Sequence, residues 1–293
     1  MRIGASVRSF YPPASAREIA TWMIERAAAA RDAQLDSLFV GDHHATPMPY
    51  VQNVPILGRM LAEWSRQPAG ALFLLPLWNP VLLAEQIGTL AAIASGRFIA
   101  QCCVGRDVDQ FRAMGADPGT RGRDFERNFL QLQGLLASKD PVRISPVPES
   151  EVEYWIGADV PVAIDRAARI GDAWLAGPNL SDEDASRLLA YYRDRCEAHG
   201  RAPLATPIRR NIHVAANERE LNERVRPAMT RAGMGAEPDK VIVGTVPQVA
   251  ESFRSLAEAG FSDVIVRHFM DEQAAVIDSY HRLAEVRKLV LDA

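Results

Sequence analysis

The sequence predicts an α/β fold, a (β/α)8 TIM barrel with insertion segments, formed as a single domain by residues 1–293. Two observations predict it. Eight short apolar stretches are each followed by a segment with helical signals, so the strands must pair in parallel through right-handed crossovers. No G-x-G-x-x-G follows the first stretch, which disfavours the rival open sheet of dinucleotide-binding proteins. A chain of 293 residues, 48% of them hydrophobic, can bury a core of this size.

Helix start signals support the elements of the first half of the chain. Ser15 and Glu18 have the S-x-x-E spacing of a capping box, which predicts a helix start. Asn79 and Pro80 supply an N-cap and a first-turn proline for a later helix. The strands expected here are Arg2–Val7, Ser37–Val40, Ala69–Leu75 and Phe98–Val104, and the helices end near Ala33, Trp64, Ser95 and Ala137.

The second half begins with a loop, because prolines 141, 146 and 148 interrupt residues 138–152. The strands expected after it are Glu153–Ile156, Ala173–Ala176, Ile208–Ala215 and Asp263–Val266. The helices expected are Pro161–Ile170, Ser181–His199, Glu218–Arg231, Gln248–Ala259 and Asp271–Leu291. Gln248–Ala259 is an extra helix, because it precedes the last strand rather than following one.

Composition excludes several classes of partner. The net charge is −4 with interspersed signs, so no basic stripe for nucleic acid is expected. The apolar runs are too short for a bilayer span, and the N-terminus lacks the apolar core of a signal peptide. Three cysteines form no C-x-x-C pair. A reducing cytoplasm is the expected location, with a small molecule as the substrate.

Barrel enzymes carry their active sites on the loops that follow the strands, and here that rule selects Asp42-His43-His44. Adjacent residues on an extended chain point in opposite directions, so all three cannot face one ligand. A histidine oriented by a carboxylate carries a proton near neutral pH. The alternative is that Asp42 caps the turn while one histidine packs against residues 45–52.

Two other features at the strand ends have weaker implications. Cys102 and Cys103 suggest redox or metal chemistry, but no further ligands stand at metal-like spacing, so buried thiols are the favoured interpretation and no metal site is expected. Gly157 and Gly177 could let backbone amides hold a phosphate. Glycines at strand ends are, however, also common in ordinary turns.

Four stretches resemble the luciferase-like superfamily, in the family's order along the chain. They are DSLFVGDH (36–43), PLWNPVLLAEQIGTLAAIASGRF (76–98), AARIGDAW (167–174) and VGTVPQVA (243–250). The second is long and specific. The resemblance implies a barrel that binds a flavin or deazaflavin at the strand ends. The G-D-H sequence is more similar to the branch that uses coenzyme F420 than to the FMN branch, and it implies hydride transfer with a small organic substrate.

The resemblance also implies roles for individual residues. Asp42 and His43 would lie beside the reactive edge of the ring, with His43 handling a proton. Leu72–Phe73 would form a non-prolyl cis peptide that supports the ring face, as is common in the family. The remaining cofactor contacts implied are Gln101, Cys103, Gly105, Gly157, Ala158, Gly177 and Pro178. A homodimer is compatible with the resemblance.

The end of the fourth strand departs from the family pattern G-x-G-x-G. Here it reads Gln101-Cys102-Cys103-Val104-Gly105 and keeps only the last glycine. Either the cofactor lies differently in this protein, or Gln101 and Cys103 contact it specifically.

Three alternatives to the F420 enzyme stay open at this point. One is an FMN-dependent monooxygenase. Another is a metal-dependent hydrolase that combines His43 or His44 with His213 and His268, although no H-x-H ends the first strand. The third is a barrel that binds a ligand without catalysis.

Overall fold

The strands form one continuous parallel sheet. The computed structural model describes residues 1–64, 68–94, 96–235 and 238–291. Within them the strand order is β6-β5-β4-β3-β2-β1-β9-β7-β8. The strands are β1 (Arg2–Val7), β2 (Ser37–Val40), β3 (Ala69–Leu74), β4 (Phe98–Cys103), β5 (Glu153–Gly157), β6 (Ala173–Leu175), β7 (Pro207–Val214), β8 (Val241–Gly244) and β9 (Asp263–His268).

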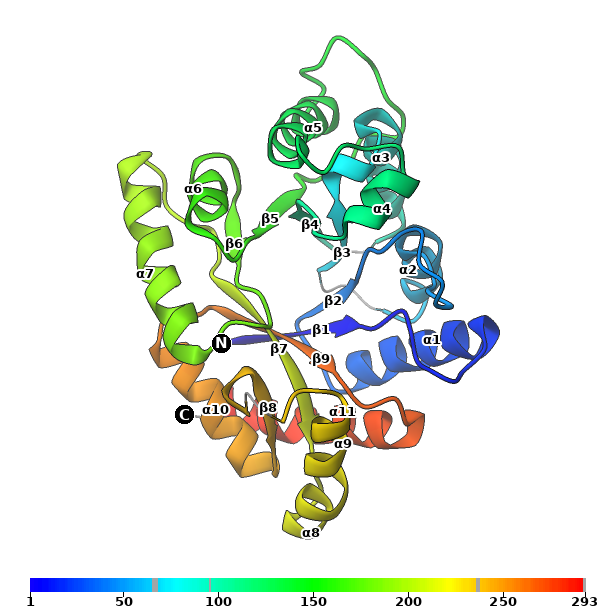
Figure 1. The fold of residues 1–293 in the computed structure, drawn as a ribbon, viewed down its shortest axis with the longest axis vertical. Helices are drawn as coiled ribbons and strands as arrows, with labels where there is room; N and C mark the ends of the chain where they lie inside the picture. The colour runs from blue at the N-terminus through cyan, green and yellow to red at the C-terminus, as the bar shows by residue number, and fades with distance from the viewer. Residues whose placement is uncertain (65–67, 95, 236–237, 292–293) are drawn as a thin grey trace.

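The sheet closes into a barrel because β6 also meets β7. The amide of Ala176 donates to the carbonyl of Pro207 at 3.0 Å, and the amide of Arg209 donates to the carbonyl of Ala176 at 3.0 Å. Parallel bridges join Ala173 to Ala205 and Ala176 to Ile208. The strands β1 to β7 and β9 therefore form a ring, with helices around its outside (Figure 1). The predicted barrel is confirmed.

Helices cover the outer surface of the ring. The longer ones are α1 (Ala16–Asp32), α2 (Asn53–Met60), α3 (Pro80–Ile93), α5 (Arg121–Leu136), α6 (Pro161–Ile170), α7 (Asp182–Ala198), α10 (Val246–Glu258) and α11 (Gln273–Leu291). The predicted capping box is present, since Glu18 Oε2 accepts from the amide of Ser15 at 2.8 Å. Asn79 accepts from the first amides of α3, as expected. Ser95, where that helix was expected to end, lies outside the described residues.

Three elements differ from expectation. The short strand β8 was missed, and it pairs with β7 outside the ring. Helix α4 (Val108–Ala113) was also missed; Asp107 caps it by accepting from two amides. The helix expected at Glu218–Arg231 is divided into α8 (Glu218–Glu220), a π-helical turn and α9 (Arg226–Arg231). Pro227 explains the division, because proline has no amide hydrogen to continue an α-helical ladder.

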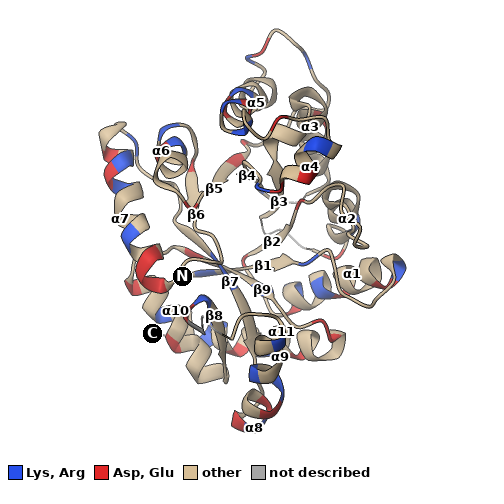
Figure 2. Cartoon of the chain, in the orientation of Figure 1, with Lys and Arg blue, Asp and Glu red and all other residues tan. Residues whose placement is uncertain are grey.

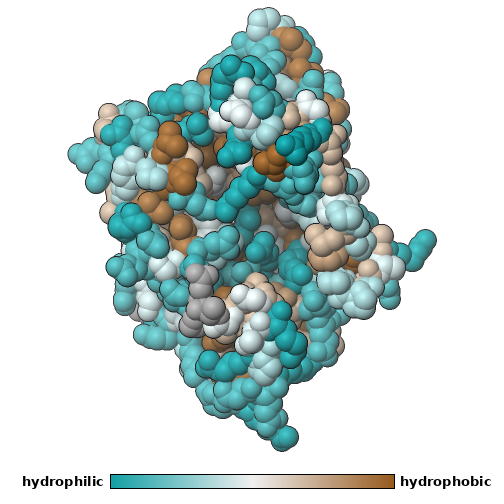
Figure 3. Space-filling view, in the orientation of Figure 1, coloured by the Kyte–Doolittle hydropathy of each residue, from teal (hydrophilic) through white to brown (hydrophobic). Residues whose placement is uncertain are grey.

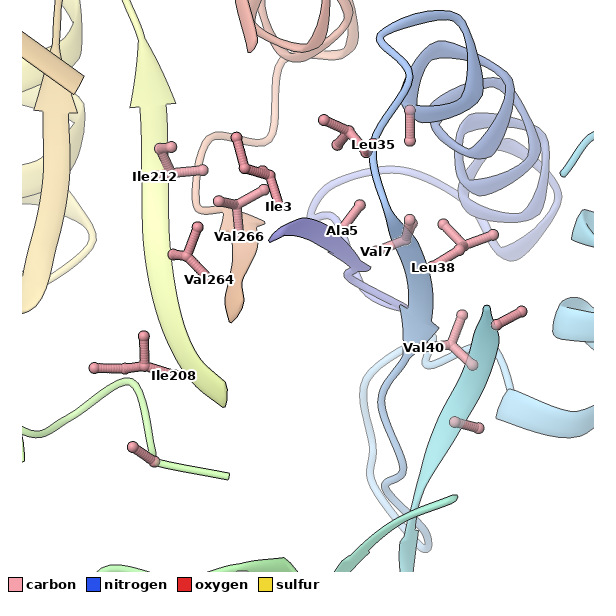
Figure 4. Close-up of a cluster of buried hydrophobic side chains, with 14 of the residues drawn as sticks. Ile3, Ala5, Val7, Leu35, Leu38, Val40, Ile208, Ile212, Val264 and Val266 are labelled. Carbon is pink, nitrogen blue, oxygen red and sulfur yellow. The ribbon is translucent and has the colours of Figure 1, made fainter. Parts of the chain in front are cut away.

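Side chains alternate between two cores along each strand. Outward residues such as Ile3, Val40 and Val264 pack against the helices (Figure 4). Inward residues form a second cluster that fills the barrel, made of Phe39, Ile99, Trp155, Ala173, Leu175, Ala205 and Ile265. Because this apolar layer closes the interior, a ligand can enter only from the layer above it, at the carboxyl ends of the strands.

The outer surface has no single-sign face, since positive and negative residues are interspersed along the helices (Figure 2). In the described part of the chain, no helix is both long enough and apolar enough to cross a bilayer.

Candidate active site

A cavity of about 1140 Å³ opens at the carboxyl ends of the strands. Figure 3 shows a hollow near the middle of this face. The cavity is bounded by the loops after β2, β4, β5 and β6 and by the first turns of α5 and α6. Nine of the predicted site residues line it, namely Asp42, His43, Leu72, Cys103, Gly105, Gly157, Ala158, Gly177 and Pro178.

The other two predicted residues do not reach the cavity. Phe73 is fully buried on the outer face of β3, edge-on to Trp78 with the ring centroids 5.8 Å apart. Gln101 is fully buried inside the barrel, and its Oε1 accepts from Nη2 of Arg209 at 2.5 Å. Because β4 and β7 are not neighbours in the sheet, this hydrogen bond crosses the barrel interior.

The expected cis peptide between Leu72 and Phe73 is wrong, because this bond is trans. Strand β3 pairs with β4 residue by residue, from Ala69 opposite Phe98 to Leu74 opposite Cys103. A non-prolyl cis bond costs about 3–4 kcal/mol and persists only where the surrounding structure enforces it. This regular ladder leaves no bulge at which such a bond would be enforced.

The carboxylate of Asp42 contacts the end of the neighbouring strand β3 as well as its own loop. Its Oδ2 accepts from the amide of Leu74 and from Nε1 of Trp78, both at 2.8 Å. Its Oδ1 lies 3.1 Å from Nε2 of His44, whose ring packs against Trp78. The carboxylate therefore joins the end of β2 to the end of β3 and orients His44. It does not pair with His43.

The imidazole of His43 is instead oriented by Gln110, a residue that sequence reasoning missed. Gln110 Nε2 lies 2.7 Å from Nδ1 of His43 and also donates to the carbonyl of His44 at 3.1 Å. Since this amide nitrogen is a donor, Nδ1 accepts and the neutral ring carries its proton on Nε2. In the described part of the chain, Nε2 of His43 has no hydrogen-bond partner. The sequence signal that could have found Gln110 is Asp107, four positions after Cys103, because it caps the helix α4 that carries Gln110.

Cys103 lines the cavity as a thiol. Burial raises its pKa to about 11, so the sulfur is protonated at neutral pH. A Cβ atom at Gly157 would lie 2.5 Å from this sulfur, so only glycine allows the end of β5 to approach β4 here. Cys102 points outward and is fully buried, and burial raises its pKa well above the ordinary value. Neither thiol has the environment of a reactive thiolate.

The outer part of the cavity is basic. Arg106, Arg121 and Arg166 line it, and Arg106 forms an ion pair with Asp159 between the loops after β4 and β5. Nε of Arg166 is buried and forms an ion pair with Oε2 of Glu126 at 3.4 Å. The first turn of α6 borders the same region and has no side-chain cap. A helix N-terminus with nearby guanidinium groups suits a phosphate.

The histidines proposed for a metal site are not brought together. His213 and His268 are almost completely buried beside α11, with ring centroids 6.2 Å apart, and neither lines the cavity with His43. Across the described ranges, no group of three or more His, Cys, Asp or Glu side chains could hold a metal ion. The metal-hydrolase alternative therefore has no ligand set at this site.

Comparison with known proteins agrees with this architecture. A sequence model of luciferase-like monooxygenases matches residues 1–259. The chain belongs to the luciferase-like monooxygenase family. Among curated relatives, the alkanal monooxygenase alpha chain of Photorhabdus luminescens is 27% identical over 123 residues, which is 40% of this chain and 33% of the relative. Other relatives, from Mycobacterium, match over 47% of their length, so the matches span less than half of these proteins.

Solved structures resemble this family member along its whole length. A monooxygenase from Streptomyces bottropensis has a TM-score of 0.80 at 18% identity and covers 97% of this chain and 98% of its own. An F420-dependent secondary alcohol dehydrogenase has a TM-score of 0.82 at 14% identity, covering 99% and 98%. The oxygenating constituent of 3,6-diketocamphane monooxygenase from Pseudomonas putida, in complex with FMN, has a TM-score of 0.77 at 16% identity, covering 97% of both chains. At these identities the likeness establishes the shared fold.

Proposed function

We propose that this protein is an oxidoreductase that transfers a hydride between coenzyme F420 and a small organic substrate at the mouth of the barrel. The observation that carries the proposal is one cavity of about 1140 Å³ with an oriented imidazole, His43, in its wall. Ligand pockets are typically about 300–1,000 Å³, so this cavity has room for a ring cofactor and a small substrate together.

The residues present fit a cofactor with a planar ring and a phosphate. Leu72 and Leu74 offer an apolar wall for a ring face. Gly105, with a φ of +85°, turns the chain away at the end of β4 so that backbone can approach a ligand. The guanidinium groups of Arg121 and Arg166 at the cavity wall and the uncapped start of α6 offer donors for a phosphate. When bound, the cofactor supplies the carbon that accepts or donates the hydride.

His43 would hold a proton at Nε2 beside the substrate oxygen. Gln110 donates to Nδ1, so the neutral imidazole carries its proton on Nε2. A neutral Nε2–H polarises a carbonyl oxygen by hydrogen bonding and stabilises the charge that develops on it during reduction. Asp42 supports this indirectly by fixing the loop that carries both histidines.

The alternative is that FMN is the cofactor and the reaction is a monooxygenation. This alternative is favoured by the family match and by the FMN-bound neighbour, because both cofactors present a tricyclic ring and a phosphate to the same kind of cavity.

Titration of the purified protein with each cofactor separates the two. We expect coenzyme F420 to change its absorbance on binding with a micromolar or lower Kd, and FMN to bind much more weakly. Arg166→Met should weaken binding of the phosphate-bearing cofactor. Arg187→Met, a surface substitution on α7 with the same change in net charge, should not. Tight binding of FMN without binding of F420 would favour the FMN-dependent monooxygenase. Binding of neither cofactor would contradict both proposed functions.

A further inference from the structure

Two guanidinium groups lie inside the barrel just below the cavity, and neither has a carboxylate partner. Arg209 on β7 is half-buried and lines the cavity floor. Arg267 on β9 is half-buried, and its Nε donates to Oδ1 of Asn211 at 3.0 Å. The register places Asn211 opposite Arg267 and Arg209 opposite Ile265, so both arginines share the inner face with the apolar cluster.

Nothing in their surroundings neutralises these charges. Burial, together with the positive charges of Arg209 and Arg8, lowers the pKa of Arg267 to about 10. Tyr50, which lies near both, is a neutral phenol because burial raises its pKa to about 12. Cys103 is a neutral thiol for the same reason. In the part of the chain that the structure describes, neither arginine forms an ion pair with a carboxylate.

Two acidic side chains at the strand ends, Asp42 and Asp271, have other partners. Asp42 is held by Leu74, Trp78 and His44, as described above. Oδ1 of Asp271 forms an ion pair with Nη1 of Arg8 at 2.9 Å, and Arg8 lies on the loop after β1. In the described residues, neither of these carboxylates forms an ion pair with Arg209 or Arg267.

Buried donors point to the same missing partner. Nε of Arg209 and Nε2 of Gln101 are both buried without a hydrogen-bond partner in the described chain. Gln101 is fully buried. In its side chain, the Oε1 atom already accepts a hydrogen bond from Arg209. Both of these unfilled positions are donors, Arg209 at the cavity and Gln101 beneath it, so the partner that Arg209 lacks is an acceptor, and a negatively charged one suits its guanidinium group.

We propose that Arg209, with Gln101 beside it and Arg267 behind it, binds the carboxylate of a small organic acid substrate. A buried cation without a partner is costly, and a ligand that supplies the opposite charge recovers that cost on binding. The carboxylate would lie at the cavity floor, which leaves the rest of the substrate directed outward, toward His43. This inference rests on the proposed function, because it names the class of substrate for the same cavity.

The test is calorimetric titration of the full chain with benzoate and hexanoate, each compared with its neutral amide, with and without coenzyme F420. We expect the acids to bind and the amides not to. Arg209→Met should weaken acid binding by about 10–100-fold, as the loss of charge-assisted hydrogen bonds does. Arg187→Met, with the same change in net charge, should leave acid binding unchanged.

Thermal unfolding distinguishes a ligand site from a structural role. Gln101→Glu places a carboxylate against Arg209, so we expect a higher Tm together with loss of acid binding. Arg209→Met should not lower Tm, since it removes an unneutralised buried cation. A large fall in Tm for Arg209→Met, with acids bound as in the native protein, would show a structural role and overturn the inference.

The remaining outcomes separate this inference from the proposed function. If F420 binds and the acids do not, the substrate class is wrong and the oxidoreductase stands. If the acids bind and neither F420 nor FMN does, the anion site stands and the oxidoreductase fails. The cofactor is also titrated in its reduced form. If Arg209→Met weakens binding of this form only and the acids never bind, the negative charge that Arg209 meets belongs to the cofactor ring, and the substrate assignment is overturned.

Discussion

At the scale of single residues, the orientation of His43 depends on which side chain meets its Nδ1. The sequence places Asp42 beside it, but the structure pairs Asp42 with His44 and gives His43 an amide donor instead. A carboxylate partner favours a charged imidazole, whereas an amide nitrogen favours the neutral ring with its proton on Nε2. The difference decides whether His43 acts as a hydrogen-bond donor or as a base.

The substitution Gln110→Glu tests this arrangement directly. A glutamate at 110 can only accept from Nδ1 of His43, so the proton should move from Nε2 to Nδ1 or the ring should become charged. Long-range ¹H–¹⁵N NMR of the histidine rings reports the tautomer without any substrate. The exposed His281 is the internal reference. An Nδ1-protonated His43 in the native protein would contradict the proposed role.

At the scale of elements, the strand ends around the cavity approach each other closely. Gly157 ends β5 against the thiol of Cys103 at the end of β4. Gly177, in the loop after β6, lies against Asp159, where an added Cβ would be 2.4 Å from Oδ1. These contacts give the predicted glycines a packing reason that is independent of any phosphate.

We expect Gly157→Ala to lower the free energy of unfolding by about 1–3 kcal/mol, as overpacking usually does. The added methyl group would lie 2.5 Å from the sulfur of Cys103, so the second substitution Cys103→Gly should recover most of the loss. Gly58→Ala on α2 is the control, because its Cβ would have no neighbour closer than 3.8 Å. Denaturant unfolding measures all three. A loss that persists in the double variant would place the strain elsewhere.

At the scale of the whole molecule, β7 connects the parts of the fold. It closes the barrel against β6, carries Arg209 to the cavity and places His213 beside helix α11. Both ring nitrogens of His213 are buried without partners, and burial lowers its pKa to about 4. Protonation of this ring is therefore coupled to unfolding.

Stability should consequently fall in acid. The unfolded chain binds a proton at His213 near pH 6.5 and the folded chain only near pH 4, so stability is complete above 6.5 and is lost as the pH falls toward 4. The loss from this residue is about 3 kcal/mol. His213→Phe should reduce the slope of stability against pH, leaving the contribution of the buried His268, whereas His281→Phe should not. Equal slopes in both variants would exclude His213 as the cause.

The alternation of apolar and helical segments was sufficient to predict the eight ring strands, because that pattern is local and repeats. Together with the family resemblance, it predicted nine residues that line one cavity, since the loops after parallel strands meet at one end of a barrel. The strand β8 and helix α4 were missed because each is short and has weak periodicity. The capping box of Ser15 and Glu18 was predictable because its partners are three residues apart.

What the sequence alone determined is therefore the fold, the family and the end of the barrel at which the predicted site residues lie. Only the tertiary structure decided that Gln110 meets His43, that Gln101 meets Arg209 across the barrel, and that the bond between Leu72 and Phe73 is trans. The physical reason is range. Periodicity and capping act between residues close in the chain, whereas hydrogen bonds across a barrel join residues as far apart as 101 and 209 and depend on closure.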